Sequence, residues 1–445
     1  MATKKDLVEA QAFSRRRLTT AFVSGAPGGR EVEPQRPMRA VIGSIALSVL
    51  LVVGGIAVGY LKPSLPSGWD DNSLVIAKKS GARYVAIKKT LYPVINTTSA
   101  RLLIPSDTFK VVTVDDDKIT NSPRGATIGI LGAPDSLPAA DRLVNSGWTA
   151  CVGQGGGIAA TIGGPAAPPA TGQATVVRTD GSLYVVTGGY RLPLRARDAT
   201  AVLRALRLDT VTPLDVPSTW TGLFPIGPTL SPLTLDNAGA AVPGLPPGAV
   251  VGSVLAVATP GADPRRYLVT PTGELAPLPP FAYALYLLGS GQSAGADIAV
   301  TPAQVGSLRN ASSSIVPKQW PETVPNALSS NPCVTLTASY TKVPTVALTT
   351  STTRPPSEGT AVVVAAGTGA LVRAIASNIV NRGPVLAVDQ TGSSYPVTPA
   401  TDDVLARLGY AAKDVTPVPQ AWMELFRSGP GLSTRAAQSA ISQGR

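Results

Sequence analysis

One stretch of the chain constrains what the rest can become: the 22 residues from Ala40 to Leu61 carry no charged side chain. A helix rises about 1.5 Å per residue, so such a run covers about 33 Å, enough for a hydrocarbon core of about 30 Å. A cleaved signal peptide is the main alternative, but its apolar region is usually about 7–15 residues long behind a short leader. Here 39 residues precede the run. We therefore predict an uncleaved transmembrane helix.

The flanking charges predict the orientation of this helix. Basic residues near a membrane helix tend to remain on the cytoplasmic side. Before the helix stand Lys4, Lys5, Arg15, Arg16, Arg17, Arg30, Arg36 and Arg39, whereas only Lys62 follows it directly. We therefore expect a single-pass protein of the inner membrane. Its amino terminus lies in the cytoplasm, and residues 62–445 lie on the periplasmic or cell-envelope side.

Composition indicates an ordered, turn-rich region beyond the helix. Charged residues make up 15% of the chain and aromatic residues 5%, while 44 glycines and 42 prolines imply many short elements. This favours a β-rich α+β region of more than one domain. The net charge of +11 is not concentrated in one patch, because eight basic and four acidic residues fall in the first 39 and the remaining surplus is spread out. We expect contact with the lipid bilayer and no nucleic-acid partner.

The two cysteines, Cys151 and Cys333, both follow the apolar run. An oxidising compartment permits a disulfide between them, and we favour that pairing. Two unpaired buried thiols remain the alternative. A zinc site is disfavoured, because the chain has no histidine and two ligands are too few.

The first residues predict a short amphipathic helix. Thr3 and Asp6 have the spacing of a helix cap, apolar residues follow at near-helical intervals, and Gly25-Ala26-Pro27 ends the pattern. The basic cluster Arg15-Arg16-Arg17 either rests on anionic headgroups or a cytoplasmic partner, or serves only as a topology signal. Within the membrane segment, the pair Gly54-Gly55 permits close packing against another helix.

A repeated pattern occurs four times after the membrane segment. An apolar strand and a turn lead to a second apolar strand, usually headed by Tyr, and a second turn leads to a proline between apolar residues. The paired positions are Tyr84 and Pro93, Tyr184 and Pro193, Tyr267 and Pro277, and Leu386 and Pro396. Helix-like stretches follow at 196–208, 281–288 and 401–408. We predict four small ββ(β)α modules.

The modules are not in tandem, so the intervening segments must form something else. Because each cysteine lies in such a segment, we expect a central disulfide-linked core with two modules on either side, elongated and quasi-symmetric. The predicted division is 1–39 cytoplasmic arm, 40–61 transmembrane helix, 62–104 module 1, 105–170 core, 171–210 module 2, 211–250 connecting segment, 251–289 module 3, 290–365 core, 366–412 module 4 and 413–445 carboxy-terminal tail.

Several motifs in their order resemble one family, EccB, the single-pass core component of type VII (ESX) secretion in actinobacteria. They are the arm TKKDLVEAQAFSRRRL, the runs 82–102 and 129–138, Trp148-Thr149-Ala150-Cys151, and the tail 418–432. The resemblance covers essentially the whole chain. Leu131 departs from it, standing where we would expect a proline, and the fourth module is degenerate.

The resemblance implies a structural scaffold of an inner-membrane secretion complex. Its expected partners are the motor ATPase EccC, the membrane components EccD and EccE, and other EccB copies in a hexameric-type assembly. Small helical secreted proteins would be moved by the motor and contact this chain only indirectly. The family's outer region, four repeat modules around a disulfide-bearing core, agrees with the division above.

An enzyme is the competing class, because family members are sometimes labelled ATPases. A P-loop requires a lysine directly after a glycine, and none of the twelve lysines follows one. The run Gly153–Gly157 is better explained as a flexible loop. With no histidine, Ser-His-Asp and Cys-His mechanisms are excluded. We expect no catalytic residues, no metal and no cofactor.

Two acidic clusters and the recurring tyrosines have structural interpretations. Asp115–Asp117 lacks the alternating spacing of a calcium loop, so a solvated turn is expected. Asp402 and Asp403 suit the first turn of a helix. Tyr84, Tyr184 and Tyr267 stand on predicted strands, where packing is the default role. Binding to peptidoglycan or another envelope glycan through the modules remains a second alternative function.

Overall fold

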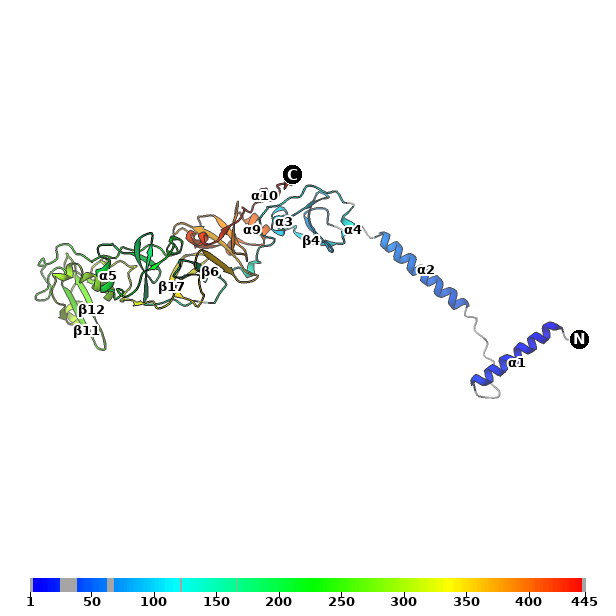
Figure 1. Cartoon of the computed structure of the whole chain (residues 1–445), viewed down its shortest axis with the longest axis horizontal. Helices are drawn as coiled ribbons and strands as arrows, with labels where there is room; N and C mark the ends of the chain where they lie inside the picture. The colour runs from blue at the N-terminus through cyan, green and yellow to red at the C-terminus, as the bar shows by residue number, and fades with distance from the viewer. Residues whose placement is uncertain (1–2, 25–37, 62–67, 121, 166, 442–445) are drawn as a thin grey trace. The chain divides into compact units, whose positions relative to one another are not determined.

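The structure is a computed structural model that describes residues 3–24, 38–61, 68–120, 122–165 and 167–441 (Figure 1). The chain divides into two units, Met1–Ser64 and Leu65–Arg445. Arg30, Arg36, Gly25-Ala26-Pro27 and Lys62, which entered the predictions above, lie outside the described residues.

The described residues of the first unit form two helices, α1 (Lys4–Ser24) and α2 (Met38–Leu61). The backbone N–H and the hydroxyl of Thr3 both donate to Asp6 Oδ2, at 2.9 and 2.6 Å, so the expected cap starts α1. Within α2 the segment Met38–Ala57 has a mean hydropathy of 2.5, and it is the one described helix long and apolar enough to span a bilayer. Its large side chains are exposed, for example Leu50 at 69%, which suits contact with lipid.

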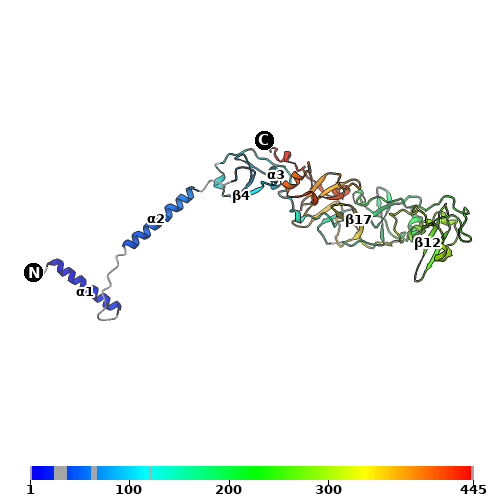
Figure 2. The same ribbon diagram turned by 180° about the vertical axis from the view of Figure 1, so that it is seen from behind.

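The described residues of the second unit form five β-sheets, and Figures 1 and 2 both label a strand in each of three of them, β4, β12 and β17. The first sheet has the order β3-β2-β1-β4 and the second β10-β7-β8-β9. Their strands are β1 (Ser73–Ala77), β2 (Arg83–Ile87), β3 (Thr90–Pro93), β4 (Lys110–Val114), β7 (Gln173–Thr179), β8 (Ser182–Thr187), β9 (Tyr190–Pro193) and β10 (Leu214–Asp215), with β15 (Asn326–Ala327) added to β7.

The third sheet has the order β13-β12-β11-β14 and the fourth β22-β19-β20-β21-β23. Their strands are β11 (Val254–Thr259), β12 (Ala262–Val269), β13 (Leu275–Pro277), β14 (Ile298–Val300), β19 (Ala370–Ile375), β20 (Val385–Val388), β21 (Ser393–Val397), β22 (Thr416–Pro419) and β23 (Arg427–Ser428). Each of these four sheets contains three consecutive antiparallel strands. A later strand then pairs in parallel with the first of the three.

The fifth sheet, which we call the disulfide sheet, has the order β17-β16-β5-β6-β18. Its strands are β5 (Trp148–Val152), β6 (Ile158–Ile162), β16 (Pro332–Ser339), β17 (Lys342–Thr350) and β18 (Thr360–Val364). Two chain segments far apart in sequence therefore meet in one sheet, where β5 pairs antiparallel with β16.

Short helices and 3-10 turns fill the connections. They are α3 (Thr97–Leu103), α4 (Asp116–Ile119), η1 (Ala140–Arg142), α5 (Ala199–Ala205), α6 (Ser218–Thr221), α7 (Pro280–Tyr286), η2 (Ser290–Gln292), α8 (Pro302–Gly306), α9 (Asp402–Leu408), η3 (Ala412–Asp414), η4 (Gln420–Leu425) and α10 (Thr434–Ala437). Thr401 caps α9 by accepting from the N–H of Val404, and Asp402 and Asp403 occupy its first turn, as expected from the sequence. Helix α5 is shorter than the stretch 196–208, and Arg207 just beyond it has a left-handed φ of 59°.

The spacing of the Tyr–Pro pairs is explained by strand register. Tyr84 pairs with Pro93, Tyr184 with Pro193, Tyr267 with Pro277 and Leu386 with Pro396. Each pair therefore spans a hairpin, and the longer spacing of the last two adds one residue to the turn.

A short return segment follows the last strand in each of the four sheets and lies beside the third strand; in the third sheet the N–H of Ala311 donates to the carbonyl oxygen of Leu275 at 2.8 Å, and in the other three sheets a glycine takes this place. The N–H groups of Gly125, Gly227 and Gly429 donate to carbonyl oxygens of Leu91, Arg191 and Ser394 at 3.0, 2.9 and 2.8 Å. A Cβ on Gly125 would lie 2.2 Å from the ring of Tyr92, and one on Gly429 would lie 2.3 Å from the ring of Tyr395. These glycines are required by the close approach.

Candidate functional site

A disulfide joins the two cysteines of the chain. Cys151 and Cys333 face each other directly on β5 and β16, with their Cα atoms 3.9 Å apart, and both side chains are buried. The predicted bridge is confirmed, and the alternative of two free thiols is wrong. The second and third sheets lie within the loop that this bond closes, whereas the first and fourth sheets lie outside it.

Three buried tryptophans surround the disulfide sheet. Trp148 donates from Nε1 to the carbonyl oxygen of Val144 at 2.7 Å, and Trp220 donates to that of Ala150 at 3.0 Å. The rings of Trp148 and Trp422 meet edge to face with centroids 6.0 Å apart. One apolar cluster therefore joins the disulfide sheet to residues of the second and fourth sheets.

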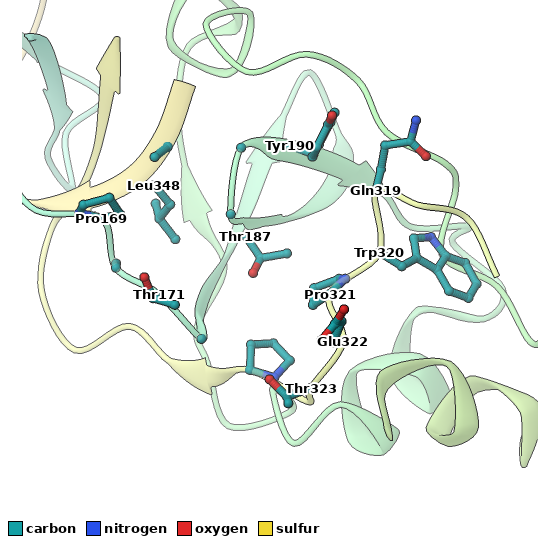
Figure 3. Close-up of a pocket in the computed structure, with 16 residues that line it drawn as sticks. Pro169, Thr171, Thr187, Tyr190, Gln319, Trp320, Pro321, Glu322, Thr323 and Leu348 are labelled. Carbon is teal, nitrogen blue, oxygen red and sulfur yellow. The ribbon is translucent and has the colours of Figure 1, made fainter. Parts of the chain in front are cut away.

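A cavity of about 340 Å³ opens where β17 meets the turn between β8 and β9 (Figure 3). Residues 169–172, 319–323 and Pro325 complete its wall, and Figure 3 shows Thr171, Thr187 and Pro321 around it. Glu322 is the one charged residue of the lining. The hydroxyl of Thr187 donates to the carbonyl oxygen of Gln173, so it is not held by a base. The lining presents no nucleophile–base pair.

A second cavity, of about 390 Å³, lies between α3 and the end of α9. Its single charged lining residue is Arg101, whose guanidinium lies 4.9 Å from the ring centroid of Phe109. Gly409, with a left-handed φ of 92°, ends α9 beside that guanidinium. Arg101 is thus near the negative end of a helix dipole, which accounts for its position.

The acidic run Asp115–Asp117 contacts the β1–β2 turn of the first sheet. Asp115 pairs with Lys78 at 3.5 Å, and Asp116 accepts from the backbone N–H groups of Lys79 and Ser80 at 2.9 and 3.1 Å. Hydrogen bonding to Ser80 and to the Lys79 backbone lowers the pKa of Asp116. The run therefore fixes the β1–β2 turn. Among the described residues no group of three His, Cys, Asp or Glu side chains is placed to hold a metal.

The glycine run after Cys151 is a packed turn. A Cβ on Gly155 would lie 2.2 Å from the carbonyl oxygen of Ser357, and one on Gly157 would lie 2.1 Å from that of Pro356. The sequence predicted a flexible loop here, because the segment that packs against the run lies about 200 residues further along the chain. The glycines are needed because backbone packs directly on backbone.

The structure places Arg15, Arg16 and Arg17 in the middle of α1. Successive helical residues differ by about 100° around the axis, so the three side chains leave in three directions and do not form one patch. Gly54 and Gly55 lie on α2 with nothing near the position of a Cβ. Whether either group contacts a partner stays a prediction.

One feature absent from the sequence predictions is the lysine pair Lys88-Lys89 at the β2–β3 turn. Both residues have left-handed backbones, with φ of 48° and 65°. The corresponding turn of the second sheet is Gly188-Gly189, midway between Tyr184 and Pro193. When the first two Tyr–Pro pairs are aligned, Lys88 and Lys89 take the positions of Gly188 and Gly189. The sequence alone could therefore have shown that lysines replace glycines at this turn.

The chain resembles secretion proteins over its whole length. Residues 1–443 match the family "Type VII secretion system ESX-1, transport TM domain B". The "ESX-2 secretion system ATPase EccB2" of Mycobacterium tuberculosis is 31% identical over 328 residues, which cover 67% of this chain and 62% of that protein. The match thus leaves over a third of that relative uncovered.

Two solved structures have a similar fold. The EccB3 dimer from the ESX-3 core complex matches with a TM-score of 0.67 and 25% identity, over 82% of this chain and all of that one. A chain of an intact ESX-5 inner membrane complex matches with a TM-score of 0.64 and 21% identity, over 100% of this chain and 96% of that one.

Proposed function

The chain belongs to the EccB family of type VII secretion systems, and from this membership we propose that it is a structural scaffold subunit of an ESX inner-membrane complex. The observation that carries the proposal is the family match over residues 1–443, because it includes both the apolar helix and the region beyond it. The buried disulfide adds support, since such a bond persists in an oxidising compartment.

The proposed topology has α1 in the cytoplasm, α2 across the inner membrane and Leu65–Arg445 on the periplasmic side. The basic residues ahead of α2 favour this orientation. In the assembly the chain contacts further EccB copies and the EccC, EccD and EccE components, with a hexameric-type stoichiometry. Helical secreted proteins pass through the complex under the action of the motor.

We further propose that the four four-stranded arrangements are copies of one module, arranged quasi-symmetrically in an elongated region on either side of the disulfide sheet. The shared strand order, the shared Tyr–Pro register and the return segments support common descent of the modules. On this proposal each module extends further than its repeated motif: β4, β10, β14 and β22 each lie beyond the ends expected from sequence, which were 104, 210, 289 and 412.

The two described cavities are structural on this view. Neither lining combines a nucleophile with a base, and the sequence has no glycine followed by lysine to hold a nucleotide phosphate. The word ATPase in the name of the ESX-2 relative therefore finds no support in the residues of this chain. Tyr84, Tyr184 and Tyr267 are each half-buried on their strands, which favours a packing role over stacking against an envelope glycan.

Purification of the tagged chain from membranes in mild detergent tests the scaffold proposal. We expect the intact mass to exceed that of one chain and to include the other membrane components. A monomer that hydrolyses ATP, with hydrolysis abolished by a point substitution, would replace the scaffold by an enzyme.

The contribution of the arm is tested with Arg15, Arg16 and Arg17 changed singly to Glu. Because the side chains diverge by about 100° steps on α1, we expect unequal losses of motor-subunit co-purification among the three variants. Equal and complete retention in all three would reduce these arginines to topology signals. Insertion of each variant is checked by protease protection.

A further inference from the structure

The Lys88-Lys89 turn is unusual in its backbone and in its position. A hairpin turn with two consecutive left-handed residues favours Asn and Gly, because a side chain at positive φ crowds the backbone. The equivalent turn in the second sheet is Gly188-Gly189, in which Gly188 is left-handed with φ of 56°. In the first sheet two exposed lysines take these places at φ of 48° and 65°. The preference of such a turn for Asn and Gly therefore does not explain why lysines stand here.

Two residues just before β1 hold the backbone of the lysine turn by hydrogen bonds. The N–H of Lys88 donates to Asp71 Oδ1 at 3.1 Å, and the N–H of Lys89 donates to the carbonyl oxygen of Asp70 at 2.7 Å. The carboxylate of Asp71 is thus directed at the backbone of the turn. Neither lysine side chain has an ion pair with a residue in the described ranges, whereas Lys78 at the opposite end pairs with Asp115.

A third lysine lies at the same end of the first sheet. Lys110 begins β4 and pairs with Ser73, which begins β1. Its Nζ lies close to Gly68, at 3.1 Å from the position of a Cβ on that residue. Lys88, Lys89 and Lys110 therefore surround the point where the chain enters the first sheet, and we call this the Ser73 end.

The covalent chain limits how far this end lies from the membrane. Seven residue steps separate Leu61, the last residue of α2, from Gly68. At about 3.6 Å per step at most, they span no more than about 25 Å in any conformation. Lys78 and Lys79, in the turn at the other end of β1, are about 17 Å further along the strand direction.

Opposing charges share the Ser73 end, so the net charge there is small. Asp70 and Asp71 precede β1, and Asp107 precedes Lys110. A lysine ammonium, however, stands on a flexible four-carbon stem and reaches beyond a carboxylate on its short one. The apex of the turn therefore presents ammonium groups first to an approaching anionic surface.

We infer that Lys88, Lys89 and Lys110 bind the anionic phospholipid headgroups of the membrane in which α2 is anchored. This inference rests on the membrane anchoring in the proposed function, but not on assembly with partners or on the direction of insertion. Contact with headgroups secures the first sheet at the bilayer surface. It also accounts for charged residues at two positions where glycine would be conformationally favoured.

The test uses the full chain in lipid nanodiscs of two compositions, phosphatidylcholine alone and phosphatidylcholine mixed with phosphatidylglycerol. A pulse of a water-soluble amine-acylating reagent labels the lysines, and mass spectrometry gives the rate at each. In the anionic discs we expect labelling of Lys88 and Lys89 to slow about fivefold each, from the usual attraction of one lysine to an anionic surface. Lys78 and Lys79 are the internal control and should label equally in both compositions.

Two variants sharpen the result. Lys88→Gly with Lys89→Gly copies the turn of the second sheet, so the fold is kept while protection of Lys110 in anionic discs is reduced. The matched variant Lys78→Gln with Lys79→Gln removes the same charge at the other end and should leave the protection of Lys110 intact. High salt should abolish protection in the unaltered chain.

Equal labelling of Lys88 and Lys89 in the two compositions overturns the inference, as does protection that appears only when partner proteins are added. Each outcome is independent of the scaffold proposal. A chain that co-purifies with its complex yet shows no lipid protection disproves only the headgroup contact. A chain that is protected but never assembles disproves only the scaffold.

Discussion

The second and third sheets are joined differently from the first and fourth. One apolar cluster runs through the second and third sheets, including Val176 and Leu206 on one side and Phe281 and Tyr286 on the other. The first sheet instead has two small clusters of its own, while Leu102 of α3 and Ile130, from the segment that follows the first sheet, enter the cluster of the fourth sheet.

Hydrogen bonds from side chains to backbone also join the first and fourth sheets. Arg407 of α9 donates to the carbonyl oxygens of Leu102 and Leu103 at the end of α3, at 3.3 and 3.5 Å. Tyr410, just beyond α9, donates to the carbonyl oxygen of Pro138 at 2.6 Å. The difference teaches that similar sheets can be joined either by a shared core or by helix ends. We expect the first kind to unfold together and the second to separate.

Removal of the disulfide should have the largest effect, and it should act on both junctions through the sheet between them. Cys151→Ser with Cys333→Ser opens a loop of 182 residues. In the loop-entropy description this costs about 5 kcal/mol of unfolding free energy, less any strain in the native bond. The thermal midpoint of the unaltered protein should fall similarly on reduction. An unchanged midpoint in both experiments contradicts a stabilising role.

Phe281→Ala should break the shared core of the second and third sheets. The side chain is fully buried and meets Trp320 edge to face with centroids 5.7 Å apart. Truncation of such a ring costs about 3–5 kcal/mol. Hydrogen exchange should accelerate together in β7–β9 and β11–β13. Acceleration confined to the third sheet argues against a single core, and Tyr340→Ala, at an exposed hairpin, is the control.

Arg407→Gln should loosen only the junction of the first and fourth sheets. The substitution removes the guanidinium that donates to the carbonyl oxygens of Leu102 and Leu103. It also removes the hydrogen bond from Arg407 Nε to Asp403 Oδ2 at 2.9 Å. The expected loss is about 1–3 kcal/mol, with faster hydrogen exchange in α3 and α9. Arg204→Gln on the exposed face of α5 is the matched control and should leave exchange unchanged. Faster exchange throughout the second sheet in R407Q contradicts the independence of the two junctions.

Acid should produce the smallest effect, confined to the first sheet. Hydrogen bonds from Ser80 and Lys79 hold the pKa of Asp116 below its ordinary value of 3.8. A carboxyl group with a lowered folded pKa stabilises the fold above its unfolded pKa and loses that contribution as pH falls through the folded one. Asp116→Asn should therefore melt lower than the unaltered chain near neutral pH, and the two should converge below 3.8. A constant difference at all pH values points to another cause, and Asp117→Asn controls for net charge.

Sequence predicted the features that depend on local pattern. The apolar helix, the Thr3–Asp6 cap, the Thr401 start of α9 and the hairpins behind the Tyr–Pro spacing all follow from short-range chemistry. The disulfide followed from compartment and cysteine number. In each case the residues that decide the structure are close in sequence or few in number.

Long-range pairing escaped prediction. Strands β4, β10, β14 and β22 are short, and what makes them strands is a parallel partner at least 30 residues earlier. The packed turn at Gly155 and Gly157 depends on Pro356 and Ser357, which no local pattern connects to it. Helix geometry alone could have predicted that Arg15, Arg16 and Arg17 point in three directions. Because they are adjacent in sequence, they were instead interpreted as one basic cluster.

The disulfide has a mechanical consequence. Tension applied between the two ends of the folded chain passes from the first sheet through the bond between Cys151 and Cys333 to the fourth sheet. The second and third sheets lie off that load path, and the 182-residue loop keeps on the order of 600 Å of contour from being pulled out. Under force the molecule can lengthen only through the parts outside this covalent ring, and a single backbone cut within the ring releases no fragment.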